Sequence, residues 1–237
     1  MPIPPEALEG IQLLIFDLDG TLVDSKLDLA LSVNTMLAQM GLRPLAHEEI
    51  AGYVGHGVTT LIQRALGEAA RDDKVEKGLA IFLDYYRRHM LDNTVTYPGV
   101  REALEGLRDR RLAVLTNKPV RFSQEILSGL GVAHYFAYVY GGNSFAQKKP
   151  DPVGAVKLMD DTGVPRRQTL IIGDSDTDVL TGRNAGTWTC GVTYGFGAHT
   201  LEIAPPDLLL NDLRELPPLL NGVRSANPTS SRESSQQ

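Results

Sequence analysis

Short apolar runs recur along the chain, and each of them predicts a buried strand. The first run covers 11–16 and is apolar except for Gln12. Further runs lie at 112–115, 138–140, 169–172, 187–192 and 207–210. Amphipathic stretches that predict helices separate them at 120–130, 152–162 and 176–186. Strands that alternate with helices form parallel sheets covered on both faces, so the pattern predicts an α/β fold.

The stretch from 24 to 96 has a different pattern, with helical spacing and no strand. Helices are predicted at 25–41, 47–53, 58–66 and 72–92. The first of them carries apolar residues on one face that we expect to be buried: Leu27, Ala30, Leu31, Leu37 and Met40. The simplest organisation is therefore an α/β core formed by 1–23 and 97–221, with a helical insertion at 24–96 after its first strand.

The last sixteen residues, 222–237, are rich in Ser and Gln and almost free of apolar side chains. Such a segment buries too little surface to offset the entropy lost on ordering, so we expect a disordered tail.

Composition excludes some classes of function. The net charge is −6, from 23 basic and 29 acidic residues, which argues against a nucleic-acid or membrane-surface binder. The single cysteine, Cys190, lies in a predicted strand and is expected to be a buried structural thiol. No apolar run is long enough to cross a membrane, and the acidic N-terminus does not resemble a secretory signal. We therefore expect a cytoplasmic protein; its oligomeric state is left open by the sequence.

Polar residues gather where the predicted strands end. Asp17 and Asp19 follow the first strand, Thr116 follows the second, and the strand at 169–172 leads into 173–178. Ligands of open parallel sheets bind at the carboxyl ends of the strands, so these side chains are expected to meet at one edge.

Each of these residues has a plain structural alternative. Thr116 could equally be a helix cap, and Lys149, in the loop at 148–152, could be a surface charge. The pair Asp17 and Asp19 is harder to explain that way, because alternation along a strand points both carboxylates to the same side. At an effective dielectric constant near 20, two unit charges about 4 Å apart interact by roughly 4 kcal/mol. A nearby cation is therefore expected.

Together with Asp174, the pair makes three carboxylates, which suit a hard divalent cation such as Mg²⁺. Histidine or cysteine ligands at metal spacing are absent, which disfavours zinc. A metal, hydrogen-bond donors for an anion and a free carboxylate nucleophile together indicate phosphoryl transfer through an aspartyl-phosphate.

Four segments in this order resemble the motifs of the haloacid dehalogenase superfamily. They are DLDGT at 17–21, TN at 116–117, KP at 149–150 and GDSDTD at 173–178. The resemblance implies a Rossmann-like, doubly wound parallel sheet, with the insertion as an α-helical cap. Five shorter segments narrow it to the phosphoglycolate phosphatase branch: 22–25, 54–57, 116–119, 141–143 and 149–152.

The resemblance also implies roles for single residues. Asp17 would attack phosphorus, and Asp19 would protonate the leaving alkoxide and then activate water. Neighbouring negative charge is expected to raise the pKa of Asp19 for this task. Asp174 would bind Mg²⁺ together with the Asp17 carboxylate and the Asp19 backbone carbonyl, whereas Asp178 would act through water or hold Lys149.

Phosphoryl oxygens would be bound by a separate group of donors, namely Thr116, Asn117 and Lys149. In the cap, the loop Gly55-His56-Gly57 is the best candidate for substrate contacts. His56 is either a ligand of a substrate carboxylate or a solvent-facing side chain. Arg64 is a weaker candidate, and Lys118 is either a substrate contact or a surface charge.

The predicted function is a Mg²⁺-dependent phosphatase of a small phosphorylated metabolite, foremost 2-phosphoglycolate. A pyrophosphatase or a broader sugar- or nucleotide-phosphate phosphatase is the alternative on the same scaffold. Dehalogenation is disfavoured because true dehalogenases lack an acid at the position of Asp19. Mutase activity is disfavoured because related mutases carry a histidine in the segment that here reads LDLAL at 27–31. A phospho-aspartate signalling module and an inactive binding protein are the non-enzymatic alternatives.

Overall fold

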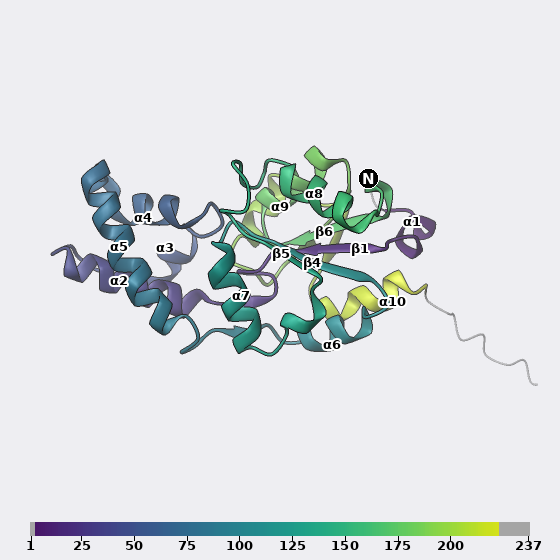
Figure 1. Ribbon diagram of the computed structural model, residues 1–237, viewed down its shortest axis with the longest axis horizontal. Coiled ribbons are helices and arrows are strands. Elements are labelled where there is room, and N and C mark those ends of the chain that lie inside the picture. Colours follow the sequence, from purple (N-terminus) through teal and green to yellow (C-terminus); the bar gives the residue numbers. More distant parts are fainter. Residues whose placement is uncertain (1–2, 223–237) are drawn as a thin grey trace, which may run out of the picture.

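The computed structural model describes residues 3–222, and a six-stranded parallel sheet forms its centre (Figure 1). The strand order is β5-β4-β1-β6-β7-β8. The strands are β1 (Leu13–Phe16), β4 (Arg111–Leu115), β5 (Tyr138–Tyr140), β6 (Thr169–Gly173), β7 (Trp188–Val192) and β8 (Leu208–Leu210). All of them lie where the apolar runs predict strands, and the α/β fold class is confirmed.

Helices cover both faces of this sheet. In Figure 1, α8 and α9 lie on one face, and α6, α7 and α10 lie on the other. The helices of this part are α1 (Pro5–Glu9), α6 (Val100–Gly106), α7 (Val120–Gly129), α8 (Val153–Thr162), α9 (Asp176–Ala185) and α10 (Leu216–Leu220). Side chains of β1 alternate between two apolar clusters, with Leu14 and Phe16 in one and Leu13 and Ile15 in the other. A strand that is buried on both faces is continuously apolar, which explains why all four residues of β1 are apolar.

Four helices form the insertion that follows β1, and they lie together beyond one end of the sheet (Figure 1). They are α2 (Lys26–Gln39), α3 (His47–Ala51), α4 (Val58–Leu66) and α5 (Asp72–His89). A short antiparallel ribbon of β2 (Val23–Asp24) and β3 (Val95–Thr96) joins them to the sheet domain. These two-residue strands are too short to produce a pattern, so the sequence does not predict them.

The buried face of α2 differs from the predicted one. Leu27 and Leu31 are 41% and 38% exposed, whereas Leu29 is buried. The reason is Asp28, which is also buried and accepts hydrogen bonds from the backbone N–H and side-chain hydroxyl of Thr94, at 2.8 and 2.7 Å. This anchor turns the helix so that a polar residue faces inward.

Helix α6 is absent from the predicted elements because seven residues are too few to show a helical period in the sequence. Its buried residues Val100, Ala103 and Leu104 nevertheless keep the spacing of one helical face. Five 3-10 helices complete the secondary structure: Gly67–Ala69, Ala133–Tyr135, Arg166–Gln168, Ala198–Glu202 and Leu213–Glu215. Within residues 3–222, no helix combines the length and the apolar character needed to cross a membrane. The predicted tail lies, from residue 223 onward, outside the described residues.

Candidate active site

The parallel register of the sheet brings the polar loops together at one edge. Phe16, the last residue of β1, is aligned with Val114 of β4 and with Ile172 of β6. Asp17, Thr116 and Asp174 each come directly after one of these strands, and all three are buried. The three loops therefore meet at the carboxyl edge, as the strand order requires.

Three carboxylates cluster at this edge. One oxygen each of Asp17, Asp174 and Asp178 lies within 4.8 Å of the others. Asp178 sits in the first turn of α9, where a reciprocal capping box with Ser175 fixes its side chain. The backbone N–H of Gly197 donates to Asp174 Oδ2 at 2.8 Å. Hydrogen bonds from Ser175 and Gly197 thus hold Asp178 and Asp174 in place.

Burial removes the water that would stabilise the charged form of these carboxylates. It raises the pKa of Asp17 to about 6, although Lys149 partly opposes the shift. It also raises the pKa of Asp174 well above its ordinary value, and the neighbouring charges of Asp178 and Asp17 add to the increase. A group of carboxylates that resists ionisation in this way fits a divalent cation, whose charge would favour the ionised forms. The donor set is all oxygen, which suits a hard metal ion.

Gly20 lets the chain pass close to the cluster. Its φ is +90°, and a Cβ there would lie 2.2 Å from Asp174 Oδ2. Only glycine combines that backbone conformation with that approach. The glycine of the DLDGT segment therefore has a packing role next to the carboxylates.

Lys149 is the cation nearest to Asp17. Its Nζ lies 2.8 Å from Asp17 Oδ1 and 2.6 Å from Asp178 Oδ1, and its side chain is buried. Burial alone would lower the pKa of Lys149, but Asp17 and Asp178 raise it above its ordinary value. Lys149 therefore stays charged, which places a positive group beside the expected nucleophile.

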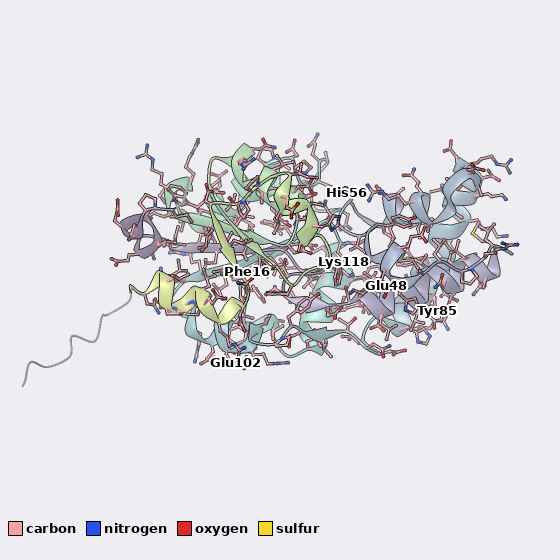
Figure 2. All side chains as sticks on the ribbon, turned by 180° about the vertical axis from the view of Figure 1, so that it is seen from behind. Phe16, Glu48, His56, Tyr85, Glu102 and Lys118 are labelled. Carbon is pink, nitrogen blue, oxygen red and sulfur yellow. The ribbon has the colours of Figure 1, made fainter. Side chains whose placement is uncertain are left out.

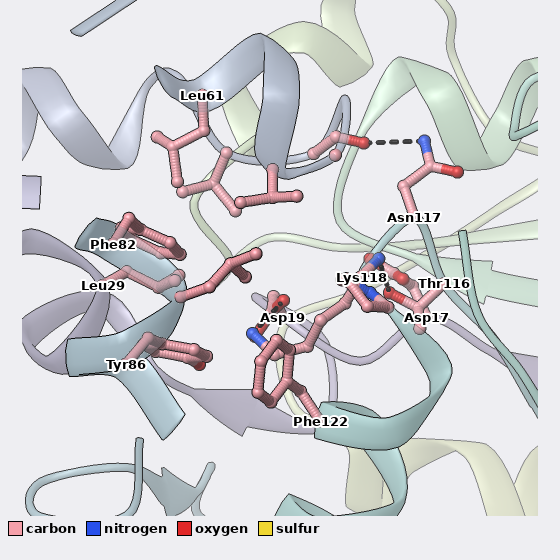
Figure 3. A pocket seen from close by; sticks show the side chains of 16 residues that line it. Asp17, Asp19, Leu29, Leu61, Phe82, Tyr86, Thr116, Asn117, Lys118 and Phe122 are labelled. Carbon is pink, nitrogen blue, oxygen red and sulfur yellow. Dashed lines mark hydrogen bonds and ion pairs between the residues drawn. The ribbon is translucent and has the colours of Figure 1, made fainter. Parts of the chain in front are cut away.

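Asn117 ties three segments together. Its side-chain amide donates to the carbonyl oxygens of Gly55 and Lys149 at 2.8 and 3.0 Å, and its Oδ1 accepts from the backbone N–H of Lys149 at 3.0 Å. Figure 3 shows the contact with Gly55 as a dashed line between the sheet domain and the insertion. The residue is placed to couple the position of the insertion to that of the Lys149 loop.

Asp19 has a different environment from the one the sequence predicts. Its nearest charged partner is the ammonium group of Lys118, with Nζ 3.0 Å from Oδ2, and Ser25 Oγ donates to Oδ1 at 2.6 Å. Asp17 and Asp19 are thus each paired with their own lysine. The two lysines supply the cations that the adjacent aspartates require.

A cavity of about 50 Å³ lies between the sheet domain and the insertion. Asp17, Thr116 and Asn117 line its one end, and Asp19 and Lys118 lie beside them (Figure 3). Its other walls are mainly apolar and come from α2, α4, α5 and α7: Leu29, Val58, Leu61, Phe82, Leu83, Tyr86 and Phe122. Two of the three predicted catalytic residues, Asp17 and Asp19, therefore line a small cavity, and the third, Lys149, contacts Asp17 from outside its lining.

The predicted cap residues divide into two groups. Gly55 and Gly57 line the cavity. His56 between them is exposed and is not among the lining residues; Figure 2 places it on the surface between the two parts of the molecule. Arg64 is also exposed and reaches the backbone oxygen of Tyr53.

Two further polar residues of the site escaped the sequence analysis. Ser25 appears there only within the segment 22–25 and at the start of a predicted helix, and Tyr86 only within the predicted helix at 72–92. Nothing in a single sequence distinguishes an inward tyrosine at a site from one in a core. For Ser25, the signal was its place directly after the first motif.

A family profile described as haloacid dehalogenase-like hydrolase matches residues 14–192. The phosphoglycolate phosphatase of Pseudomonas putida is 40% identical over 216 residues, which cover 87% of this chain and 79% of that protein. The enzyme of the same name from Vibrio parahaemolyticus is 37% identical over 217 residues, which cover 88% of this chain and 95% of that protein. A crystal structure of a predicted phosphoglycolate phosphatase from Haemophilus somnus superposes with a TM-score of 0.84 at 33% identity, covering 87% of this chain and 96% of that one.

Proposed function

This chain belongs to the haloacid dehalogenase-like hydrolase family, and we propose that it hydrolyses the phosphate ester of 2-phosphoglycolate. The observation that carries the proposal is the placement of Asp17 and Asp19, each paired with a buried lysine, at the mouth of a small cavity. The names of the relatives from Pseudomonas putida and Vibrio parahaemolyticus support the substrate. The cavity of about 50 Å³ suits a small metabolite rather than a macromolecule.

The reaction would proceed in two steps at Asp17. In the first, a carboxylate oxygen of Asp17 attacks phosphorus, the bond to the ester oxygen breaks, and Asp19 gives a proton to the leaving alkoxide. In the second, Asp19 takes a proton from water, whose oxygen attacks phosphorus and releases phosphate from Asp17. Ser25 and Lys118 hold the Asp19 carboxyl group from two sides, so it is oriented for both transfers.

Donors around the transferring group would stabilise its charge. Lys149 lies 2.8 Å from Asp17 Oδ1, in position to contact phosphoryl oxygens once they arrive. Thr116 lines the same end of the cavity and presents a hydroxyl group. Asn117 bonds the backbone of Lys149 on both its donor and acceptor sides, so we assign it to positioning that loop.

We further infer that the metal ion of this site is Mg²⁺. Asp17 and Asp174 would be ligands together with the backbone carbonyl of Asp19, and Asp178 would hold Lys149 and complete the acidic cluster. When bound, the ion supplies positive charge to the phosphoryl oxygens and to the nucleophilic carboxylate. The chain's own part is to fix these oxygens before substrate binds.

The helical insertion is proposed to act as a cap that excludes water during the reaction. Its boundaries are proposed at 24 and 96, next to the ribbon that joins it to the sheet domain. Gly55 and Gly57 would approach the substrate with their backbone. His56 would contribute only if the loop moved, because its side chain is exposed.

A direct assay tests the proposed substrate. Release of inorganic phosphate would be measured with Mg²⁺ from 2-phosphoglycolate, pyrophosphate and several sugar and nucleotide phosphates. We expect the highest kcat/KM with 2-phosphoglycolate. Equal or faster hydrolysis of pyrophosphate or of sugar phosphates would contradict it and favour the broader phosphatase. No turnover of any ester would favour a signalling or binding protein instead.

A further inference from the structure

The cavity has a chemical asymmetry that the phosphatase mechanism does not use. One end carries the groups that would handle phosphate, and the walls toward the cap are largely apolar. Of the sixteen residues that line the cavity, Lys118 is the sole basic one. A leaving group with a negative charge would therefore meet a cation at one place among the described residues.

Lys118 still has donor capacity where it stands. Its Nζ lies 3.1 and 3.0 Å from the two carboxylate oxygens of Asp19. An ammonium group has three donors, so at least one is left for a further acceptor. The same Nζ lies 4.8 Å from the centre of the Tyr86 ring, which comes from the cap helix α5. The cation thus stands between the catalytic acid and the cap.

Tyr86 offers a second donor in the same space. The residue is 1% exposed, and its hydroxyl group lies beside the Lys118 ammonium group without a hydrogen bond of good geometry to any described residue. Burial raises the pKa of Tyr86 to about 12, so the hydroxyl keeps its proton. A buried donor without a partner costs free energy, which a ligand could recover.

We propose that Lys118 and Tyr86 bind the carboxylate of the substrate and thereby select an anionic leaving group. The proposal rests on the proposed function, because it assumes 2-phosphoglycolate as the substrate. In that molecule one methylene separates the carboxylate from the ester oxygen. Asp19 would protonate this ester oxygen, and the Lys118 ammonium group contacts Asp19. When the ester oxygen lies at Asp19, the carboxylate, one methylene away, is therefore within reach of Lys118.

This assignment also replaces the earlier candidates for the carboxylate. His56 and Arg64 are exposed and do not line the cavity. Lys118 comes from the sheet domain and Tyr86 from the cap, so the carboxylate would bridge the two parts (Figure 3). Recognition of the leaving group would then favour the closed arrangement of the cap.

The test compares two substrates that differ in one charge, 2-phosphoglycolate and its neutral amide 2-phosphoglycolamide. Lys118→Met removes the ammonium group and keeps a stem of similar length, and Tyr86→Phe removes only the hydroxyl. Lys148→Met is the matched control, since Lys148 is an exposed lysine beside Gly57 that does not line the cavity. kcat and KM would be measured for both substrates with each full-length variant.

We expect Lys118→Met to lower kcat/KM for 2-phosphoglycolate about 10- to 100-fold more than for the amide, mainly through KM. Tyr86→Phe should lower it by about 3- to 10-fold more than for the amide. Lys148→Met should leave the ratio of the two substrates unchanged.

Different failures have different meanings. If the wild-type protein does not hydrolyse 2-phosphoglycolate, the proposed function itself is wrong. If it hydrolyses 2-phosphoglycolate and its amide equally well, the proposed function stands and the inference is wrong, because the carboxylate is not recognised. If it prefers 2-phosphoglycolate and Lys118→Met keeps that preference, the proposed function stands and the carboxylate site lies elsewhere. An equal loss with both substrates would make Lys118 a support for Asp19 only, which also overturns the inference.

Discussion

Two buried lysines meet the catalytic aspartates, and their surroundings differ. Lys149 lies between Asp17 and Asp178, at 2.8 and 2.6 Å, entirely within the sheet domain. Lys118 pairs with Asp19 at 3.0 Å, and beyond that contact it faces Tyr86 of the cap and the cavity. One lysine is enclosed by acids of the core, and the other stands at the boundary of two structural units.

Their degree of charging does not separate the two lysines. Burial alone would lower the pKa of each, and the neighbouring carboxylates raise it above the ordinary value in both cases. What separates them is their place, because Lys118 lines the cavity and Lys149 does not. In the proposed function, Lys149 would contact the phosphoryl group that every phosphate ester shares, whereas Lys118 would contact the part in which esters differ. The comparison teaches that one site can use one cation for phosphoryl transfer and another for the choice of leaving group.

The largest effects should come from the group that all substrates share. Asp17→Asn removes the nucleophile and should lower kcat by about 10⁴-fold or more with every ester. Lys149→Met should lower kcat/KM by about 10²- to 10³-fold, because it removes a donor that stabilises charge in the transition state. Steady-state kinetics on 2-phosphoglycolate and its amide would check both variants. A loss with Lys149→Met confined to one substrate would break the distinction between the two lysines.

Metal binding should depend on pH through the acids around Lys149. Their pKa values are raised in the folded protein, to about 6 for Asp17, so folding takes up protons above pH 4. In the metal-free protein the stability from this effect is complete below about pH 4 and is lost as the pH rises through about 6. Added Mg²⁺ would bind the ionised acids, so its stabilising effect should grow over the same range.

Thermal unfolding with and without Mg²⁺ would measure this effect. At a metal concentration about 100-fold above the dissociation constant, we expect a rise in Tm of about 5–10 °C at pH 7.5 and a smaller one at pH 5. Asp174→Asn should remove the rise, and Asp176→Asn, at the first residue of α9 and outside the cluster, should keep it. A rise of the same size at both pH values would contradict the assignment. Chelation should also stop turnover, and Mg²⁺ should restore it.

These two environments were open to sequence analysis to different extents. Asp17, Thr116 and Asp174 follow apolar strands that could be recognised, and parallel strands place their ends at one edge. Lys149 was a candidate donor from its place in a loop at this edge, but a lysine in a loop is most often a surface charge, and the motif resemblance gave it a role. The α/β fold was predictable for the same reason as the edge, since strand and helix periods alternate clearly.

The cavity side of the site was not predictable from local pattern. Tyr86 belongs to a helix whose apolar period is the same whether it faces a core or a ligand. Lys118 is buried where Tyr86 of α5 and Asp19 lie against it, and these long-range contacts leave no trace in nearby residues. His56 had the expected chemistry for a ligand, but the positive φ of the glycines on either side gives the loop a course that exposes it.

Asn117 links the two lysine sites, and its loss should affect both. Asn117→Ala removes hydrogen bonds to Gly55 and to the backbone of Lys149. We expect the free energy of unfolding to fall by about 1–3 kcal/mol and kcat/KM to fall about tenfold with both esters. Asn143→Ala is the control, because Asn143 accepts one hydrogen bond from Val120 on the exposed side. If both variants lowered kcat/KM equally, the loss would reflect stability rather than coupling; denaturant titration beside kinetics would measure both quantities.

Ser25→Ala should have the smallest effect and yet separates two explanations for Lys118. Ser25 Oγ donates to Asp19 Oδ1 at 2.6 Å, so its removal loosens the acid without removing the cation. We expect kcat to fall about 3- to 10-fold, by the same factor for 2-phosphoglycolate and its amide, with KM unchanged. Ser32→Ala is the matched control, since Ser32 is buried in the same helix and bonds only the Asp28 carbonyl oxygen in the described structure. A selective loss with 2-phosphoglycolate in Ser25→Ala would mean that substrate choice passes through the orientation of Asp19, and Lys118 would then act on the acid rather than on the carboxylate.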